Sequence, residues 1–235
     1  MMAGMGKVVD LLNRPTYGLA QVDRLLGLPG GTARRWIDGY ERAGKRYPPV
    51  VRESSTGDEI ATWGEFVETR LLSEYREAGV PLLRMRPAVE ALRQELKVQY
   101  PLASARTWLR AEGRELVRVV QEKVKLDSHL ALVVVDSGQV LCWSAEADNF
   151  RSAIDWTGKG DDAEPRRLRP IAGIEEVVVD PLLGFGEPVV RGVRTEIIAE
   201  LAKAGESQDA IAATYELERP LVEAAVRYEL LRAAA

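Results

Sequence analysis

Two short apolar helices separated by a turn rich in proline and glycine constrain this chain more than any other feature. The segment Leu19–Leu26 reads LAQVDRLL and places its apolar side chains at helical spacing. Gly27 stands where a helix C-cap is expected, and Pro29 prevents the helix from continuing. Thr32 is expected to cap a second helix, because its hydroxyl group can accept a hydrogen bond from the next turn. The spacing therefore predicts a tight helix-turn-helix.

The second predicted helix has one apolar face and one basic face. Its apolar face is expected to carry Ala33, Trp36, Ile37 and Tyr40, at helical intervals. Arg34 and Arg35 fall off that face and are expected to point toward solvent. Exposed arginines at this place suit a DNA major groove, because a guanidinium can hold guanine or phosphate through two hydrogen bonds. The alternative is a pair of solvated arginines on an ordinary surface helix.

The charge distribution favours a basic surface next to this motif. The 235 residues have a net charge of −4, but the first 100 carry 15 Lys and Arg against 13 Asp and Glu. The segment 30–52 concentrates this excess, with six basic residues and two acidic ones. A local positive patch of this kind is what phosphate binding requires.

A wing is predicted after the second helix. Its two short strands are expected at 50–52 and 59–61, on either side of a polar turn signal that reads STGDE. Lys45, Arg46 and Arg52 would then lie near the DNA backbone, whereas the alternative is a plain polar loop. The predicted DNA-binding residues are Thr32, Arg34, Arg35, Lys45, Arg46 and Arg52.

The whole chain is predicted to have an α+β, mostly helical fold in three parts. Residues 1–97 form the winged helix-turn-helix. In this part Thr62 and Glu65 make a capping box that opens a long helix, and Pro87 kinks or restarts a later one. Residues 181–235 form a three-helix domain, with Ser207 capping its second helix and Pro220 opening its third.

Residues 98–180 are predicted to form a small mixed region. The stretch 130–143 consists of two apolar runs around an Asp-Ser-Gly turn at 136–138, which favours a hairpin. The stretch 105–120 fits either a hairpin or a short helix. Residues 157–170 read as a loop rich in glycine, aspartate and proline, and 175–181 as a strand.

The sequence offers no set of residues that would support an enzyme. It contains one histidine, His129, and one cysteine, Cys142, so a zinc site of the usual ligands cannot form within one chain. No phosphate-binding glycine loop is present, and the Gly-x-Gly of GFGEPV lacks its third glycine. We therefore expect no catalytic residues, no metal and no cofactor. No run of apolar residues is long enough for a membrane span, which favours a cytoplasmic protein.

Two segments resemble known bacterial families. The stretch YGLAQVDRLLGLPGGTARRWIDGYERAGK, followed by a wing and REAGVPLLRMRPAVEALRQEL, resembles the winged helix-turn-helix of MerR-type regulators. The second stretch, FGEPVVRGVRTEIIAELAKAGESQDAIAATYELERPLVEAAVRYEL, is similar to a small domain found in toxin–antitoxin operons. The matching positions of that domain are Gly186, Pro188, Val189, Gly192, Arg194, Gly205, Ser207, Ile211, Ala212 and Tyr215.

A basic head followed by this tail is similar to VapB-type antitoxins of the larger kind. The resemblance implies a type II antitoxin that neutralises a cognate PIN-domain ribonuclease and autoregulates its operon by binding operator DNA. A homodimer is expected, because DNA-binding domains of this kind bind operators that consist of two half-sites. Typical VapB antitoxins are shorter and bind DNA through a ribbon-type end, so this chain departs from them there.

The toxin-binding residues and one rival function stay open at the level of sequence. Arginines that pair with the carboxylates of a PIN ribonuclease could be Arg191 and Arg194, or Arg166, Arg167 and Arg169 in the polar loop. Arg194 could equally bind loop carbonyls. The rival function is a transcriptional regulator that responds to a small molecule, with a pocket in the middle region lined by Trp143, Phe150 and Trp156.

Overall fold

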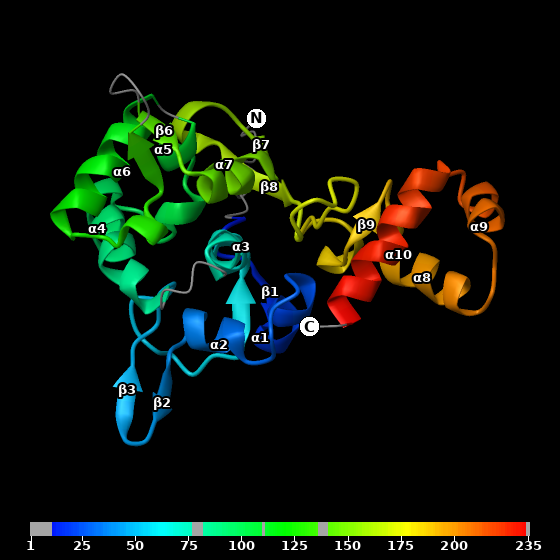
Figure 1. Ribbon diagram of the computed structural model, residues 1–235, viewed down its shortest axis with the longest axis horizontal. Helices are drawn as coiled ribbons and strands as arrows, with labels where there is room; N and C mark the ends of the chain where they lie inside the picture. The colour runs from blue at the N-terminus through cyan, green and yellow to red at the C-terminus, as the bar shows by residue number, and fades with distance from the viewer. Residues whose placement is uncertain (1–10, 77–81, 110, 136–140, 234–235) are drawn as a thin grey trace, which may run out of the picture.

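The computed structural model describes residues 11–76, 82–109, 111–135 and 141–233. The predicted class is confirmed: the fold is α+β and mostly helical, and its short strands form antiparallel pairs. Figure 1 shows a larger body, built by the chain up to about β8, and a helical C-terminal body beside it. The helix-turn-helix lies at the lower edge of the larger body.

The N-terminal part consists of a helical pair, a hairpin and a long buried helix. Its first strand, β1 (Pro15–Gly18), pairs with β4 (Ile60–Thr62). Between them lie α1 (Leu19–Leu25), α2 (Thr32–Ile37), β2 (Tyr40–Arg42) and β3 (Lys45–Tyr47). The next helix, α3 (Trp63–Glu74), starts with the predicted capping box, in which the Thr62 hydroxyl and the Glu65 carboxylate each accept a backbone N–H. Most residues of α3 are buried, so it is the central helix of the larger body.

The strands of the wing were predicted at the wrong place. The hairpin is formed by β2 and β3, where Tyr40 pairs with Tyr47 and Arg42 with Lys45. Residues 50–52 form no strand, and the second predicted strand overlaps β4, which pairs with β1 instead. The turn signal around Gly57 therefore belongs to the connection between the hairpin and β4.

The middle part begins with η2 (Leu82–Met85) and α4 (Arg86–Leu96), and Pro87 lies in the first turn of α4, as a restarted helix requires. After η3 (Pro101–Ala103), the stretch 105–120 is helical and forms α5 (Ala105–Trp108) and α6 (Ala111–Lys123). After η4 (Ser128–Leu130), the hairpin predicted at 130–143 is confirmed by the antiparallel pairing of β5 (Val133–Val135) with β6 (Leu141–Trp143), whereas its turn at 136–138 lies outside the described residues.

The remaining middle elements end in a second hairpin. They are α7 (Ala145–Ser152), β7 (Ile154–Thr157), η5 (Gly160–Asp162) and β8 (Glu164–Leu168). The strand β8 pairs with β7, so the prediction of a loop over 157–170 holds only for its first half. The strand predicted at 175–181 is reduced to isolated bridges, from Val178 to Val189 and from Val179 to Leu168.

The C-terminal body contains the three predicted helices. After η6 (Gly184–Gly186), the hairpin of β9 (Val189–Val190) and β10 (Val193–Arg194) leads into α8 (Thr195–Lys203), α9 (Gln208–Thr214) and α10 (Arg219–Ala233). The Ser207 hydroxyl accepts from the N–H of Ala210 and caps α9 as predicted. In the described ranges every helix is too short or too polar to span a lipid bilayer.

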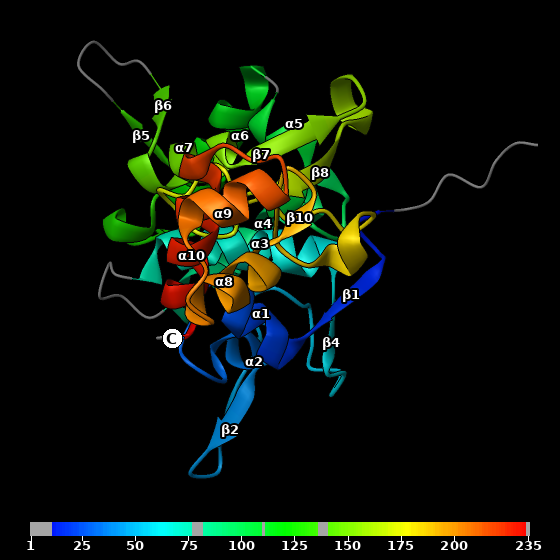
Figure 2. The same cartoon turned by 90° about the vertical axis from the view of Figure 1, so that its right-hand side faces the viewer.

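Buried apolar side chains form two clusters. The first is continuous from Leu11 to Val179 and fills the larger body, and the second runs from Ile174 to Tyr228 and lies among the C-terminal helices. Figure 2 shows the C-terminal helices in front of the larger body, with the β2–β3 hairpin extending away from both. The hairpin is thus free to contact another molecule.

Candidate nucleic-acid interface

The turn between α1 and α2 is fixed by a buried aspartate. The two carboxylate oxygens of Asp23, in α1, accept hydrogen bonds from the backbone N–H groups of Gly31 and Ala33, each at 2.7 Å. Burial raises the pKa of Asp23, although those backbone bonds oppose the shift. The Asp23 carboxylate therefore binds the free backbone N–H groups at the start of α2. The sequence had predicted that the Thr32 hydroxyl would fill this capping role.

Thr32 is a correction to the predicted DNA-binding set. The helix begins at Thr32 itself with Gly31 as its cap, and the Thr32 residue is only 5% exposed. Its hydroxyl accepts a hydrogen bond from the Arg35 guanidinium at 2.9 Å. Since a buried hydroxyl cannot reach DNA, Thr32 positions Arg35 and does not contact DNA itself.

Arg34 and Arg35 lie on the exposed side of α2, as predicted, while Ala33 and Ile37 are buried beneath them. Arg34 forms an ion pair with Glu59, and both side chains are largely exposed, at 46% and 63%. Exposed ion pairs of this kind contribute little to stability because water and salt screen them. The pair therefore holds Arg34 at the surface without burying it.

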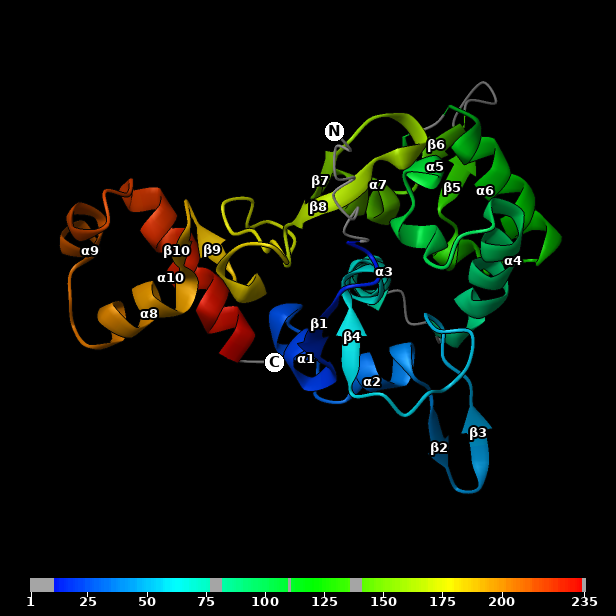
Figure 3. The same ribbon diagram turned by 180° about the vertical axis from the view of Figure 1, so that it is seen from behind.

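The β2–β3 hairpin carries the wing. Its two turn residues, Ala43 and Gly44, both have positive φ angles, as a two-residue type I′ turn requires. At its base, the rings of Tyr40 and Tyr47 stack at 4.6 Å. Figure 3 shows this hairpin projecting next to α2, so the helix and the hairpin are neighbours at the lower edge of the larger body.

Three basic side chains of the hairpin, those of Arg42, Lys45 and Arg46, are exposed. In the described part of the chain, none of them takes part in an ion pair, and Lys45 lies 5.4 Å from the centre of the Tyr47 ring. With Arg34 and Arg35 they form a basic surface that we call the α2–wing surface. Unpaired cations of this kind can release counterions when they bind phosphates.

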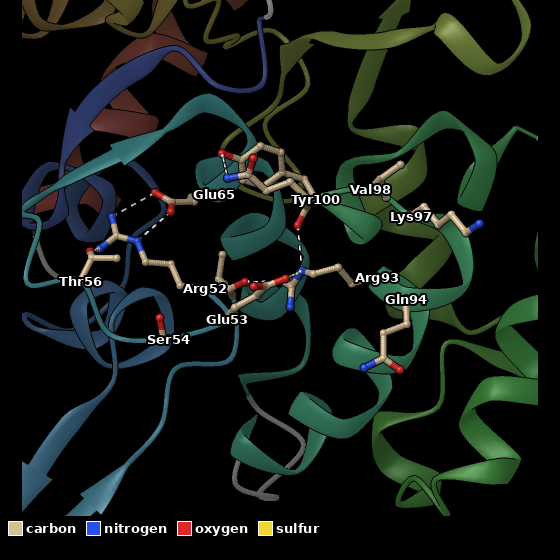
Figure 4. Close-up of a pocket in the computed structure, with 12 residues that line it drawn as sticks. Arg52, Glu53, Ser54, Thr56, Glu65, Arg93, Gln94, Lys97, Val98 and Tyr100 are labelled. Carbon is tan, nitrogen blue, oxygen red and sulfur yellow. Dashed lines mark hydrogen bonds and ion pairs between the residues drawn. The ribbon is translucent and has the colours of Figure 1, made fainter.

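Arg52 does not belong to the α2–wing surface, which corrects its predicted role. Its guanidinium lies between Asp38 and Glu65, at 2.8 and 2.7 Å, and only 9% of its side chain is exposed. Figure 4 shows the contact with Glu65. It also donates to backbone carbonyls of Asp58 and Ile60. Every donor that could reach a phosphate is used internally, so Arg52 locks the segment after the wing to α3.

Asp38 is the second centre of this lock. It accepts hydrogen bonds from Arg52, from the Ser55 hydroxyl and from the backbone N–H groups of Thr56 and Gly57. Burial alone would raise the pKa of Asp38, but these donors together lower it to about 2. The carboxylate is therefore ionised at neutral pH and fixes the segment that follows α2.

A cavity of about 590 Å³ opens beside this lock, between the segment after the wing and the C-terminal end of α4 (Figure 4). Its cationic wall is formed by Arg52, Arg93 and Lys97. Arg93 donates to the carbonyls of Val51 and Gln99, so it too is engaged in holding loops together. Arg52 and Arg93 on this wall therefore hold loops of the fold together, whereas the basic side chains of the α2–wing surface are exposed.

Comparison with known proteins places this interface in a recognised family. Residues 15–89 match the family described as "Putative DNA-binding HTH domain", and residues 177–228 match "Protein of unknown function (DUF433)". The Mycobacterium tuberculosis protein "Uncharacterized protein Rv2308" is 37% identical over 226 residues, which cover 94% of this chain and 92% of the relative. "Putative antitoxin VapB45" from the same organism is 30% identical over 230 residues, which cover 91% and 93%. This chain belongs to the family of Rv2308 and VapB45.

A solved structure shares the fold of this family member. The crystal structure of Rv2018 from Mycobacterium tuberculosis matches with a TM-score of 0.71 at 26% identity, and the match covers 90% of this chain and 97% of the other. The helix-turn-helix prediction is therefore confirmed by both the family match and the geometry. The antitoxin resemblance is supported by one relative that carries that name.

The segment matched by DUF433 contains Arg191 and Arg194, the first pair of predicted toxin contacts. Both are exposed at the β9–β10 hairpin, and neither forms an ion pair within the described residues. The other three candidates are engaged internally. Arg166 and Arg167 pair with the buried Asp180, and Arg169 pairs with Asp155 and Glu175. Arg191 and Arg194 are thus the candidates without an internal ion pair, whereas the second set is already paired within the fold.

The pocket expected for the rival function is not formed by its predicted residues. Phe150 is completely buried, and Trp156 packs against the core from β7. A groove does run past Trp143, but its other aromatic wall is Trp108, whose ring lies 4.7 Å from that of Trp143. Among the described residues, no group of three or more His, Cys, Asp or Glu side chains could hold a metal ion.

Proposed function

We propose that this chain is an antitoxin that represses its own operon by binding operator DNA as a homodimer and neutralises a cognate PIN-domain ribonuclease. The proposal requires no catalytic residue and no cofactor. It is supported by the match to a DNA-binding helix-turn-helix family and by the relative named as an antitoxin. The observation that carries it is the α2–wing surface, where five exposed basic side chains lie on one short helix and its neighbouring hairpin.

The geometry of α2 explains how this surface would read DNA. The short helix presents Arg34 and Arg35 side by side, while Asp23 holds its first turn. A helix of this kind enters the major groove with its N-terminal residues toward the base edges, and the basic wing contacts the neighbouring phosphates. The hairpin cations would then add affinity, and the two arginines would add sequence preference.

The DNA-binding part is tested by fluorescence anisotropy with a duplex from upstream of the operon. The double variant Arg34→Ala/Arg35→Ala should bind about tenfold or more weakly, since each good base contact contributes about 1–3 kcal/mol. The control Arg118→Ala/Arg219→Ala removes the same charge from α6 and α10, away from the α2–wing surface. Equal affinity of the two double variants would refute the role of α2.

The toxin part is tested with the PIN-domain protein encoded beside this chain. Its co-purification with the wild-type chain is expected, and Arg191→Glu/Arg194→Glu should abolish the complex, because the reversed charges would repel a carboxylate cluster. The absence of a neighbouring PIN reading frame, or of a complex with the wild-type chain, would contradict the proposal.

A further inference from the structure

The loop before β9 holds a phenylalanine in an unfavourable position. Phe185 is 99% exposed, and its φ angle of 59° lies in the left-handed region that non-glycine residues rarely adopt. Two more large apolar side chains precede it, Leu182 and Leu183, which are 44% and 48% exposed. The three residues form what we call the Phe185 loop, in the yellow segment between β8 and β9 (Figure 1).

Buried contacts hold this loop at both ends. At its start, the buried carboxylate of Asp180 accepts from the N–H of Leu182 at 2.9 Å, and Arg166 and Arg167 pair with the same carboxylate. At its end, the hydroxyl of Tyr17 donates to the carbonyl of Gly186 at 2.7 Å. The loop is therefore fixed by the cores of the molecule while its apolar side chains point away from them.

The position of Gly186 shows how closely the loop is fitted. Its φ is +78°, and a Cβ atom added there would lie 2.8 Å from the Tyr17 oxygen. Glu187, the next residue, accepts a hydrogen bond from Gln21 in α1 at 3.0 Å. A strained backbone that the surroundings enforce, together with an exposed apolar cluster, is typical of a binding site prepared for a partner.

Unpaired positive charge lies next to the Phe185 loop. The Val189 side chain lies under Gly184, where an added Cβ would be 3.7 Å away, and Val189 pairs with Arg194 across the β9–β10 hairpin. Arg191 and Arg194 are exposed without an ion pair among the described residues. A second copy docked symmetrically here would add its own two exposed arginines to the same interface. The complementary partner is a different protein with carboxylates.

We propose that the Phe185 loop is the anchor by which this chain docks its toxin. Phe185 enters an apolar pocket on that protein, and Arg194 meets carboxylates at the rim of the pocket. This inference rests on the proposed function and adds to it the residue that carries the affinity. A large apolar side chain that enters a pocket and is ringed by polar contacts is the usual form of a binding hot spot, and here the backbone of the loop that presents it is already fixed before binding.

The test uses the neighbouring PIN-domain protein and measures its Kd for the full-length chain by isothermal titration calorimetry. Phe185→Asn should weaken binding about thirtyfold, the loss typical of a hot-spot aromatic residue. Asparagine tolerates a left-handed backbone, so the variant should fold with an unchanged melting temperature. Phe185→Tyr should keep most of the affinity. The control Val135→Asn removes another exposed apolar side chain, 61% exposed on the middle hairpin, and should bind like the wild type.

Each outcome decides between the two proposals. If the wild-type chain binds and Phe185→Asn binds equally well, the anchor is refuted and the antitoxin function stands. If the wild-type chain does not bind, the antitoxin function fails and this inference fails with it. Sedimentation velocity on the chain alone provides the third outcome. If the wild-type chain is a dimer, Phe185→Asn is a monomer and the affinity for the toxin is unchanged, the loop serves self-association and the anchor is overturned.

Discussion

Arg34 and Arg52 differ in burial and in their ion-pair partners, and this difference decides whether each guanidinium is available to bind DNA. Arg34 pairs with Glu59 where both side chains are exposed, so the pair is weak and can be replaced by a phosphate. Arg52 lies between two buried carboxylates, and removing it would leave Asp38 and Glu65 as uncompensated buried charges. The same guanidinium is therefore available for binding in the first case and a structural cross-link in the second.

The exposed pair leads to a prediction about affinity. Glu59→Gln should increase affinity for operator DNA by about threefold to tenfold, because it frees Arg34 and removes a negative charge next to the phosphates. Anisotropy titrations at several salt concentrations measure the effect. The gain should shrink as salt rises, and the control Glu223→Gln, on α10, should change nothing. A decrease in affinity would mean that Glu59 positions Arg34 for DNA.

The buried pair leads to a prediction about acid stability. Asp38 has its pKa lowered to about 2 in the fold, whereas its ordinary value is near 3.8. Its ionised form therefore contributes stability above pH 4, about 2 kcal/mol, which is lost as the pH falls from about 4 to about 2. Urea unfolding between pH 5 and pH 2 should show a smaller acid dependence in Asp38→Asn than in the wild type. Asp209→Asn, an exposed control, should keep the wild-type dependence, and equal slopes for all three would contradict the assignment.

At the scale of elements, the wing depends on backbone geometry that its sequence only partly favours. The turn needs two positive φ angles, and Gly44 accepts one easily, while Ala43 pays a conformational cost at φ 52°. Gly39 has φ 79°, and a Cβ added there would lie 2.6 Å from the carbonyl oxygen of Tyr47. Glycine at 39 is thus required for the hairpin to leave α2 at this angle.

The unfavourable turn residue predicts a stabilising substitution. Ala43→Asn gives the Asn-Gly pair that type I′ turns prefer, and should stabilise the hairpin by about 0.5–1 kcal/mol. Hydrogen exchange of the β2 and β3 amides measures this directly, with slower exchange expected. Ala43→Val, with a β-branched side chain at the same φ, should have the opposite effect. Faster exchange in Ala43→Asn would show that another interaction sets the turn.

Local signals in the sequence predicted elements well, and contacts between distant residues were not predictable. The capping box at Thr62 and Glu65, the cap at Ser207 and the three C-terminal helices follow from residues a few positions apart. The wing strands were misplaced because the partner of β4 is β1, far earlier in the chain. An aspartate inside α1 also gives no local hint that it caps α2.

In the candidate site too, the features set by neighbouring residues were predictable, and those set by contacts between distant residues were not. The exposed arginines of α2 could be predicted from helical spacing alone. The internal role of Arg52 depends on Asp38 and Glu65 meeting it from other elements, and charge counts cannot distinguish that from a wing cation. The Phe185 loop was missed because strain and exposure are properties of the folded backbone.

At the scale of the whole molecule, two buried tyrosine hydroxyl groups join bodies that have separate cores. Tyr17, beside α1, donates to the carbonyl of Gly186, and Tyr228, on α10, donates to the carbonyl of Leu25 at 3.0 Å. In Figures 1 and 3 the C-terminal end of α10 lies next to α1. The helix-turn-helix is therefore tied directly to the body that carries the Phe185 loop and Arg194.

These two hydrogen bonds are expected to make the bodies unfold together. Tyr17→Phe/Tyr228→Phe leaves two buried carbonyls without their donors, at a cost of about 1–3 kcal/mol each. Calorimetry should show one transition for the wild type and, in the double variant, an earlier separate transition of the C-terminal body. Tyr75→Phe is the matched control, since the Tyr75 hydroxyl bonds Ser144 within the first core, and it should lower stability without splitting the transition. A single transition in the double variant would mean that apolar packing between α1 and α10 couples the bodies. Splitting would show that the two hydroxyl groups couple the unfolding of the helix-turn-helix to that of the body that carries the Phe185 loop.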